Sequence, residues 1–142
     1  MVGSDFTALR EIFKAAPFIR SLGMELASLK AGECSSTLEV RTDHLQQNGV
    51  VHAAVLTALA DHTAGGAAAS VLPAGSYPLT AEISLTLLRS AKAARLRCVA
   101  RVLKAGRAVV FVESEVLTAE GESSELLVKA LVTLAVVTPG GG

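Results

Sequence analysis

Apolar residues recur along the chain at two periods, one typical of helices and one typical of strands. Helical spacing occurs in two stretches. The first begins after Ser4, a residue type that favours the N-cap, and runs to about Ala16, where Pro17 ends it. The second is rich in alanine and runs from about His52 to Ser70. The sequence therefore predicts a short N-terminal helix and one long central helix.

Six further segments have the spacing or the composition of strands. Leu79–Leu87 alternates most regularly, whereas Leu126–Val137 is apolar at nearly every position, as expected of a strand covered on both faces. The predicted strands are Met24–Ala31, Glu33–Arg41, Leu79–Leu87, Arg95–Leu103, Ala108–Thr118 and Leu126–Val137. Gly32, Gly106 and Gly121 mark turns between them. Short turns between the later strands favour an antiparallel meander.

The order of these elements predicts an α+β fold. An antiparallel sheet has one face to bury, and the segment Val50–Leu72 is the only one long and apolar enough to cover it. We therefore expect the sheet to wrap around the central helix. The length of 142 residues fits a single domain.

Composition and charge exclude several classes of protein. Thirteen Lys and Arg balance thirteen Asp and Glu, and 4% of residues are aromatic, which argues against a nucleic-acid partner. Cys34 and Cys98 lie far apart without a nearby His, so we expect two reduced core cysteines. Met1–Arg10 lacks the segments of a signal peptide, and a cytoplasmic protein is expected. Asp61 argues against a membrane span over Val50–Leu72, since a central charge costs about 2.5–3.5 kcal/mol.

Asp61 is also the strongest candidate for chemistry. On a helical wheel its neighbours within about 60° are small, namely Ala54, Thr57, Ala58, Ala64, Gly65 and Ala68. Val55, Leu56 and Leu59 lie opposite and are expected to face the sheet. Desolvation among apolar neighbours raises the pKa of a carboxyl group and makes it a better base or nucleophile. The alternative is a structural carboxylate that pairs with an arginine or lies in a dimer interface.

The start of the central helix supplies hydrogen-bond donors. The N–H groups of Ala53 and Ala54 lie in the first turn, where they and the helix dipole can stabilise an oxyanion. Gln46, Asn48 and His52 lie just upstream and can bond the same oxygen. Each also has a local explanation: solvation for Gln46, a turn for Asn48 and fixing of the loop for His52.

These residues resemble a known family. Gln46-Gln47-Asn48-Gly49-Val50-Val51-His52-Ala53-Ala54, followed by Leu59-Ala60-Asp61, resembles the hotdog-fold acyl-CoA thioesterases of the phenylacetate-degradation (PaaI) and 4-hydroxybenzoyl-CoA type. That family has Asn, two residues, Gly, two residues, His-Gly-Gly and then a carboxylate in mid-helix. Thr80-Ala81-Glu82-Ile83-Ser84-Leu85 and Lys104-Ala105-Gly106-Arg107 resemble its next strand and its glycine-basic hairpin. The resemblance covers about residues 20–137 and implies one hotdog domain over residues 1–142.

The resemblance implies hydrolysis of an acyl-CoA thioester to the free acid and coenzyme A. Asp61 matches the family's catalytic carboxylate, which acts as a general base or as a nucleophile. Ala53 matches the position whose backbone N–H polarises the carbonyl, with Gln46 assisting, and Thr80 matches a position that helps to place the water. The resemblance further implies at least a homodimer, with a homotetramer as a dimer of dimers, because the family builds each site from two subunits. No cofactor, metal, nucleic acid or membrane is expected.

Further residues are expected to bind the substrate. They are Asn48, Gly49, His52, Ala54, Arg89, Lys92 and Arg107. The three basic side chains suit the phosphates of coenzyme A, although solvated residues at strand edges explain each of them equally well. Ala53-Ala54 replaces the family's Gly-Gly and adds two methyl groups where the thioester lies. His62 and Thr63 are expected to meet the core or a partner, and His44 to lie in a loop.

Two other functions compete with hydrolysis. A hotdog dehydratase needs a catalytic His about where this chain has Gln47, which disfavours that reaction. A non-catalytic module that binds acyl-CoA or acyl carrier protein has the Ala-Ala substitution as its only support. The acyl group stays open among short, medium and aromatic chains.

Overall fold

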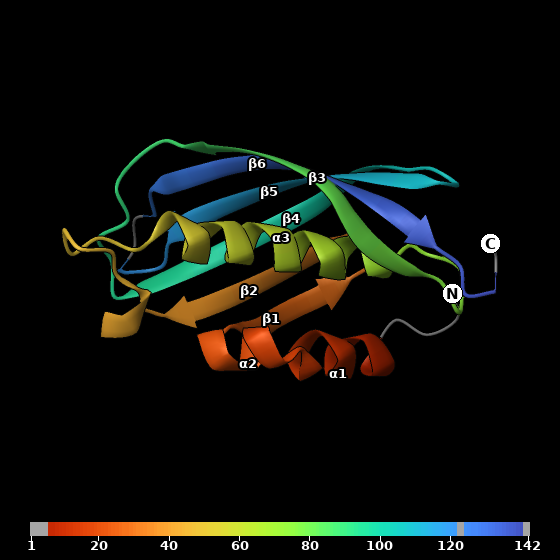
Figure 1. The fold of residues 1–142 in the computed structure, drawn as a ribbon, viewed down its shortest axis with the longest axis horizontal. Helices are drawn as coiled ribbons and strands as arrows, with labels where there is room; N and C mark the ends of the chain where they lie inside the picture. The colour runs from red at the N-terminus through yellow and green to blue at the C-terminus, as the bar shows by residue number, and fades with distance from the viewer. Residues whose placement is uncertain (1–5, 122–123, 141–142) are drawn as a thin grey trace.

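The computed structural model describes residues 6–121 and 124–140, and its elements follow the predicted order (Figure 1). The helices are α1 (Thr7–Ala15), α2 (Pro17–Leu22) and α3 (Ala53–Ala69), and a short 3-10 turn spans Thr42–His44. The strands are β1 (Glu25–Lys30), β2 (Glu33–Glu39), β3 (Tyr77–Leu87), β4 (Arg95–Ala105), β5 (Val109–Thr118) and β6 (Leu126–Val137). The predicted α+β class, with one long helix and an antiparallel sheet, is confirmed.

The sheet has the strand order β1-β2-β4-β5-β6-β3, with every pairing antiparallel. The meander predicted for the later strands is correct for β4, β5 and β6 but wrong for β3, which pairs with β6 at the sheet edge. The residues between β3 and β4 cross the end of the sheet instead. Along this path the Leu88 N–H donates to Leu127, and the Ala91 and Ala94 carbonyls accept from Val51 and Val40.

Helix α3 lies across the concave face of the sheet and forms the centre of the core (Figure 1). Val55, Leu56 and Leu59 are buried against the sheet, as predicted. Two buried hydrogen bonds join helix and sheet: the Thr63 and Ser36 hydroxyls lie 2.7 Å apart, and Ser114 donates to the Ala60 carbonyl at 2.8 Å. These bonds satisfy polar groups that would otherwise be costly to bury.

One face of α3 is only partly covered by the described residues, with α1 packed against it at His62. We call this face the exposed stripe, and it consists of the exposed Ala54 and the half-buried Thr57, Ala58, Asp61, His62, Gly65, Gly66 and Ala69. Two of the small neighbours of Asp61 on the helical wheel, Ala64 and Ala68, are not part of this stripe, since both are fully buried. Asp61 therefore lies along one side of the stripe, because the curved sheet covers more of the helix than a flat sheet would.

The N-terminal region contains two helices where the sequence predicts one. Pro17 does end α1, but it also occupies the first turn of α2, where the missing N–H of proline costs nothing. The predicted N-cap Ser4 lies outside the described residues. Phe6 precedes α1 in a left-handed conformation with φ of 51° and is buried.

The sequence predicts burial for the two cysteines and for both faces of the last strand. Cys34 and Cys98 are buried free thiols, as predicted, and burial raises the pKa of each to about 12. Strand β6 is covered on its inner face, but its outer face is open in the chain, where Leu131 is 53% exposed. No helix among the described residues is long and apolar enough to span a membrane.

Candidate active site

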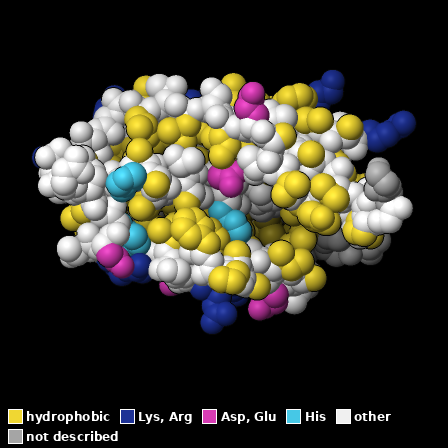
Figure 2. All heavy atoms as spheres, in the orientation of Figure 1, with side chains coloured by type: hydrophobic (Ala, Val, Ile, Leu, Met, Phe, Trp, Pro, Cys, Tyr) yellow, Lys and Arg dark blue, Asp and Glu magenta, His cyan; other side chains and the backbone are white. Residues whose placement is uncertain are grey.

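Asp61 lies half-buried on α3, next to the edge strand β3. Its Oδ1 accepts a hydrogen bond from the Thr80 hydroxyl at 2.6 Å. Figure 2 shows this face, on which an acidic side chain lies near the centre among hydrophobic and neutral atoms while Lys and Arg lie at the periphery. The hydroxyl proton of Thr80 is used on Asp61, so Thr80 can meet a water molecule only as an acceptor. The second carboxylate oxygen of Asp61 has no hydrogen-bond partner among the described residues.

The position of Thr80 depends on an irregularity in β3. The register of β3 against β6 shifts between Thr80 and Glu82, so Ala81 is an extra residue in the strand. Thr80 pairs with Leu134, whose side chain is buried on the helix side of the sheet. The hydroxyl of Thr80 is thereby directed at α3, and the structure brings together two of the four predicted catalytic residues.

The first turn of α3 is capped by His52. The imidazole Nδ1 of His52 accepts a hydrogen bond from the Ala54 N–H at 2.9 Å, and the backbone N–H of His52 donates to the His44 carbonyl at 2.9 Å. The Ala53 N–H makes no hydrogen bond to any residue within 6–121 or 124–140. Of the two donors predicted here, Ala54 is therefore occupied and Ala53 is available for a ligand oxygen.

Gln46, Asn48 and Gly49 form a tight turn before this helix. The Gly49 N–H donates to the Gln46 carbonyl at 3.0 Å, and Gly49 has a φ of +84°, which glycine adopts without strain. The Gln46 side chain accepts a bond from the Asn48 N–H. The local explanation given for Asn48 therefore holds in the structure, while Gln46 also lines a cavity at the helix start.

Two cavities divide the predicted site. One, of about 520 Å³, lies at the start of α3 and is lined by Gln46, His52, Ala53 and Arg89, among others. The other, of about 540 Å³, is mainly apolar and contains Asp61 and Thr80. Ala53 and Asp61 are eight residues apart, which corresponds to about 12 Å along a helix. The Ala53 N–H and the Asp61 carboxylate of one chain therefore cannot contact the same carbonyl group.

The basic residues predicted to bind coenzyme A lie at two ends of the sheet. Arg89 lines the cavity at the helix start and donates to the Leu126 carbonyl at the beginning of β6. Lys92 is exposed in the same crossing segment. Arg107 lies in the β4–β5 turn, beside the other end of β6. Within one chain, Arg89 and Lys92 therefore lie at the same end of the sheet, whereas Arg107 lies at the opposite end.

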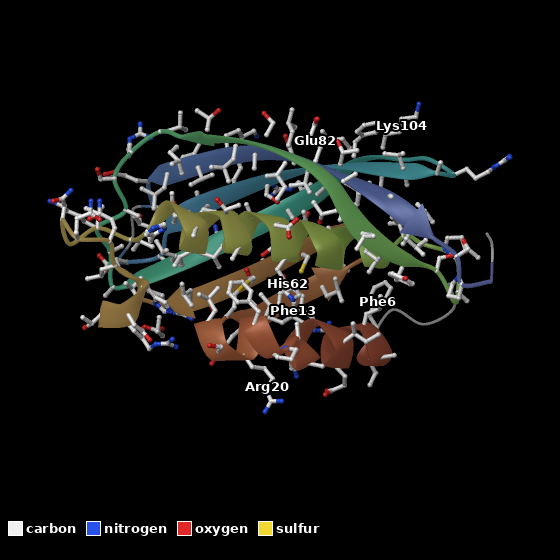
Figure 3. All side chains as sticks on the ribbon, viewed as in Figure 1. Phe6, Phe13, Arg20, His62, Glu82 and Lys104 are labelled. Atoms are coloured by element: carbon white, nitrogen blue, oxygen red, sulfur yellow. The ribbon has the colours of Figure 1, made fainter. Side chains whose placement is uncertain are left out.

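The histidines have structural partners. The His62 Nε2 lies 2.9 Å from the Phe13 carbonyl, and the centroids of the two rings lie 4.2 Å apart between α1 and α3, with the ring planes tilted by 52° (Figure 3). Burial lowers the pKa of His62, which favours the neutral form. His44, predicted as a simple loop residue, is buried, with Nδ1 accepting from the Arg41 N–H and Nε2 bonded to the Leu22 carbonyl. Both rings hold the N-terminal helices in place.

Sequence reasoning missed the walls of the apolar cavity. Leu9, Ile12 and Phe13 of α1 line it together with Gly65 of α3. The helical spacing of these α1 residues was visible in the sequence, but nothing in it showed that they would meet α3. Among the described residues, no three His, Cys, Asp or Glu side chains are placed to share a metal ion.

Comparisons with known proteins agree with this architecture. A family model described as the thioesterase superfamily matches residues 48–125. A search of curated proteins gave no significant match. Among solved structures, a thioesterase family protein from Silicibacter pomeroyi shares 23% sequence identity over 92% of this chain and 96% of its own, with a TM-score of 0.88. Thioesterase HI1161 from Haemophilus influenzae shares 22% over 94% and 90%, with a TM-score of 0.84.

A third similar structure is a mutant of the phenylacetic acid degradation protein PaaI from Thermus thermophilus. It shares 26% sequence identity over 84% of this chain and 98% of its own, with a TM-score of 0.74. These likenesses confirm the predicted hotdog fold. The matched family segment runs from the turn before α3 to the residue before β6, which is more than half of the 142 residues. The chain belongs to the thioesterase superfamily.

Proposed function

We propose that the protein hydrolyses an acyl-CoA thioester in the manner of the PaaI and 4-hydroxybenzoyl-CoA type. The observation that carries this proposal is the Asp61 carboxylate, held by Thr80 beside an apolar cavity. Membership of the thioesterase superfamily supports the reaction class. The Ala53 N–H at the start of α3, which no described residue accepts, supports the same chemistry, because it can donate to a developing oxyanion.

The proposed reaction needs two groups on opposite sides of the thioester carbonyl. Asp61 either takes a proton from a water molecule that attacks the carbonyl carbon or attacks that carbon itself. The Ala53 N–H stabilises the resulting oxyanion, with Gln46 assisting. The carbon–sulfur bond then breaks, and coenzyme A leaves as the thiolate. With Asp61 as nucleophile, water afterwards hydrolyses the acyl-enzyme and releases the acid.

The site is proposed to form between two subunits. Within one chain the two groups are separated by about 12 Å of helix. Strand β3 has a single partner, β6, among the described strands, so its other edge can pair with a second copy of the chain. Such pairing places the exposed stripes of two α3 helices side by side and brings Asp61 of each towards Ala53 of the other. A homodimer is then the smallest active unit, and a homotetramer a dimer of such dimers.

Coenzyme A is proposed to lie along the cavity at the helix start. Arg89 lines this cavity, and Lys92 lies in the same segment, so both side chains can bind the phosphates of a coenzyme A molecule in the cavity of their own subunit. Arg107 can contribute only from elsewhere in the assembly, given its place at the far end of β6.

The test is thiol release from acyl-CoA substrates by the wild type and by Asp61→Asn. We expect the substitution to lower kcat by about 10²–10⁴-fold, the range for a general base, with little change in Tm. Asn keeps an oxygen that can accept from Thr80, so the helix surface is preserved. Turnover undiminished in Asp61→Asn would exclude this mechanism. Absence of turnover by the wild type, with acyl-CoA still raising Tm, would indicate a binding module instead.

A further inference from the structure

The apolar cavity beside Asp61 is an elongated space between three elements. One wall is α3 from Asp61 to Ala69, and a second is the start of β3 from Thr80 back to Tyr77. Helix α1 closes the third side with Leu9, Ile12 and Phe13. The hydrogen bond between His62 and the Phe13 carbonyl holds α1 against α3 along this space. The cavity thus begins at the reacting carboxylate and continues away from it between apolar side chains.

The length of this cavity follows from the geometry of its walls. Asp61 to Ala69 spans eight residues of helix, about 12 Å, and Thr80 to Tyr77 spans three residues of strand, about 10 Å. An extended polypeptide advances about 1.2 Å per backbone bond, and we use the same value for an extended acyl chain. The cavity therefore accommodates about eight to ten bonds in line. A volume of about 540 Å³ lies within the range of cavities that bind small organic ligands.

Two adjacent glycines on α3 differ in what surrounds them. A Cβ added to Gly66 would lie 2.8 Å from the Cys34 sulfur and 3.3 Å from the Phe13 ring, so the space there is already filled. A Cβ added to Gly65 would meet nothing within 4 Å. Gly65 lines the cavity one turn beyond Asp61, about 6 Å along the helix. The absent side chain of Gly65 is therefore part of the open volume.

The lining also discriminates by charge. Its ionisable side chains are Asp61, His62 and Tyr77, and the described residues of the lining include no Lys or Arg. The Nε2 of His62 is hydrogen-bonded to the Phe13 carbonyl, and burial lowers the pKa of the ring, so that its neutral form is favoured. A carboxylate at the far end of an acyl chain would therefore lose its hydration without gaining a cationic partner.

We propose that this cavity binds the acyl group of the substrate, that it selects an uncharged aliphatic chain of medium length, and that Gly65 sets the length accepted. The proposal rests on the proposed function, because it assigns the substrate of that same site. The acyl carbonyl lies at Asp61, and the chain runs past Gly65 towards Ala69 and Tyr77. A larger side chain at position 65 closes the cavity one turn from the carbonyl and leaves room for short acyl groups alone.

The experiment compares kcat/KM for octanoyl-CoA and butyryl-CoA in the wild type, Gly65→Leu and Ala15→Leu. Ala15 is exposed on α1 and lines neither cavity, so Ala15→Leu adds the same side chain to a helix surface outside the site and is the matched control. We expect Gly65→Leu to lower the octanoyl-to-butyryl ratio by about 10- to 200-fold, the effect of a methylene that no longer fits an apolar pocket. The ratio in Ala15→Leu should match that of the wild type. A uniform loss on both substrates in Gly65→Leu would overturn the assignment while leaving hydrolysis established.

A binding measurement separates failure of this inference from failure of the proposed function. If the wild type hydrolyses neither substrate and is also inactive on benzoyl-CoA, the proposed function fails, and calorimetric titration of octanoyl-CoA and butyryl-CoA still tests the cavity. Tighter binding of octanoyl-CoA than of butyryl-CoA, lost in Gly65→Leu, would support the acyl site. Equal affinity for the two ligands in the wild type would contradict it.

Discussion

Two adjacent N–H groups in the first turn of α3 differ in their hydrogen bonding. His52 caps the helix by accepting the Ala54 N–H, and the Ala53 N–H remains without a bond among the described residues. A helix start that satisfied both groups internally would be a better cap but could not bind an oxyanion. The arrangement therefore leaves the Ala53 N–H as a donor that the proposed oxyanion can use.

Proline at position 53 should remove that donor with little effect on the fold. Proline is well tolerated as the first residue of a helix, and His52, with φ of −62° and ψ of 139°, has the conformation that a residue before proline adopts. We expect Ala53→Pro to lower kcat by about 10²–10³-fold, the effect of losing one oxyanion donor, while Tm changes little. Steady-state kinetics and thermal unfolding measure both. Ala53→Gly, which keeps the N–H, is the control, and an equal loss in that variant would refute the assignment.

Residue chemistry was predictable where it follows from local sequence. Asp61 in an apolar helix and the donors at the helix start can be identified from the sequence alone, whereas the hydrogen bond from Thr80 to Asp61 became evident only in the structure. The buried role of His44 was not visible, because its partners Arg41 and Leu22 lie in two other segments. Long-range partners of this kind depend on tertiary packing, which periodicity does not encode.

At the scale of elements, the long helix and all six strands lie where periodicity placed them, and two features do not. The second N-terminal helix was missed because a proline both ends one helix and suits the first turn of the next. The pairing of β3 with β6 was missed because turn lengths indicate which strands are neighbours in sequence, whereas edge pairing depends on the whole sheet. The position of Asp61 at one side of the exposed stripe likewise depends on sheet curvature.

The packing of α1 on α3 predicts a pH dependence of stability. Burial holds the pKa of His62 below the ordinary value of 6.5 in the folded chain, although the Phe13 carbonyl and Asp61 oppose this effect. As pH falls through 6.5, the unfolded chain binds a proton that the folded chain resists, so stability is full above this pH and declines below it. We expect the Tm of His62→Gln to fall less than that of the wild type between about pH 8 and pH 5. Parallel decline in the two proteins would show that other groups account for the effect.

The two glycines of α3 predict opposite effects of one added methyl group. Gly65→Ala should raise the free energy of unfolding by up to about 1 kcal/mol, because alanine favours a helix and the site is open. Gly66→Ala should lower it, since overpacking against Cys34 and Phe13 costs about 1–3 kcal/mol and exceeds the gain in helix propensity. Urea unfolding of both variants measures the difference. Equal stability of the two would mean that the core adapts to the extra volume.

At the scale of the whole molecule, a shared site predicts complementation between two inactive variants. Asp61→Asn and Ala53→Pro each damage both sites of their own homodimer. In a mixed dimer, one site combines the intact Asp61 of one subunit with the intact Ala53 of the other. Co-expression should therefore recover about a quarter of wild-type activity, since about half of the dimers are mixed and each has one intact site. Light scattering on the same samples gives the assembly, and a monomer without recovered activity would argue for sites within single chains.

The two buried cysteines bear on the proposed reaction, because that reaction releases a thiol. Thiol–disulfide exchange requires a thiolate and access to it, and Cys34 and Cys98 have neither at neutral pH, because both are buried with a pKa near 12. Free coenzyme A, or its oxidised disulfide, therefore finds no partner in the folded chain with which to form a mixed disulfide. Under the proposed function, the protein would not be modified by the coenzyme A that it releases, and a thiol-reactive dye added to the native mixture should report coenzyme A alone.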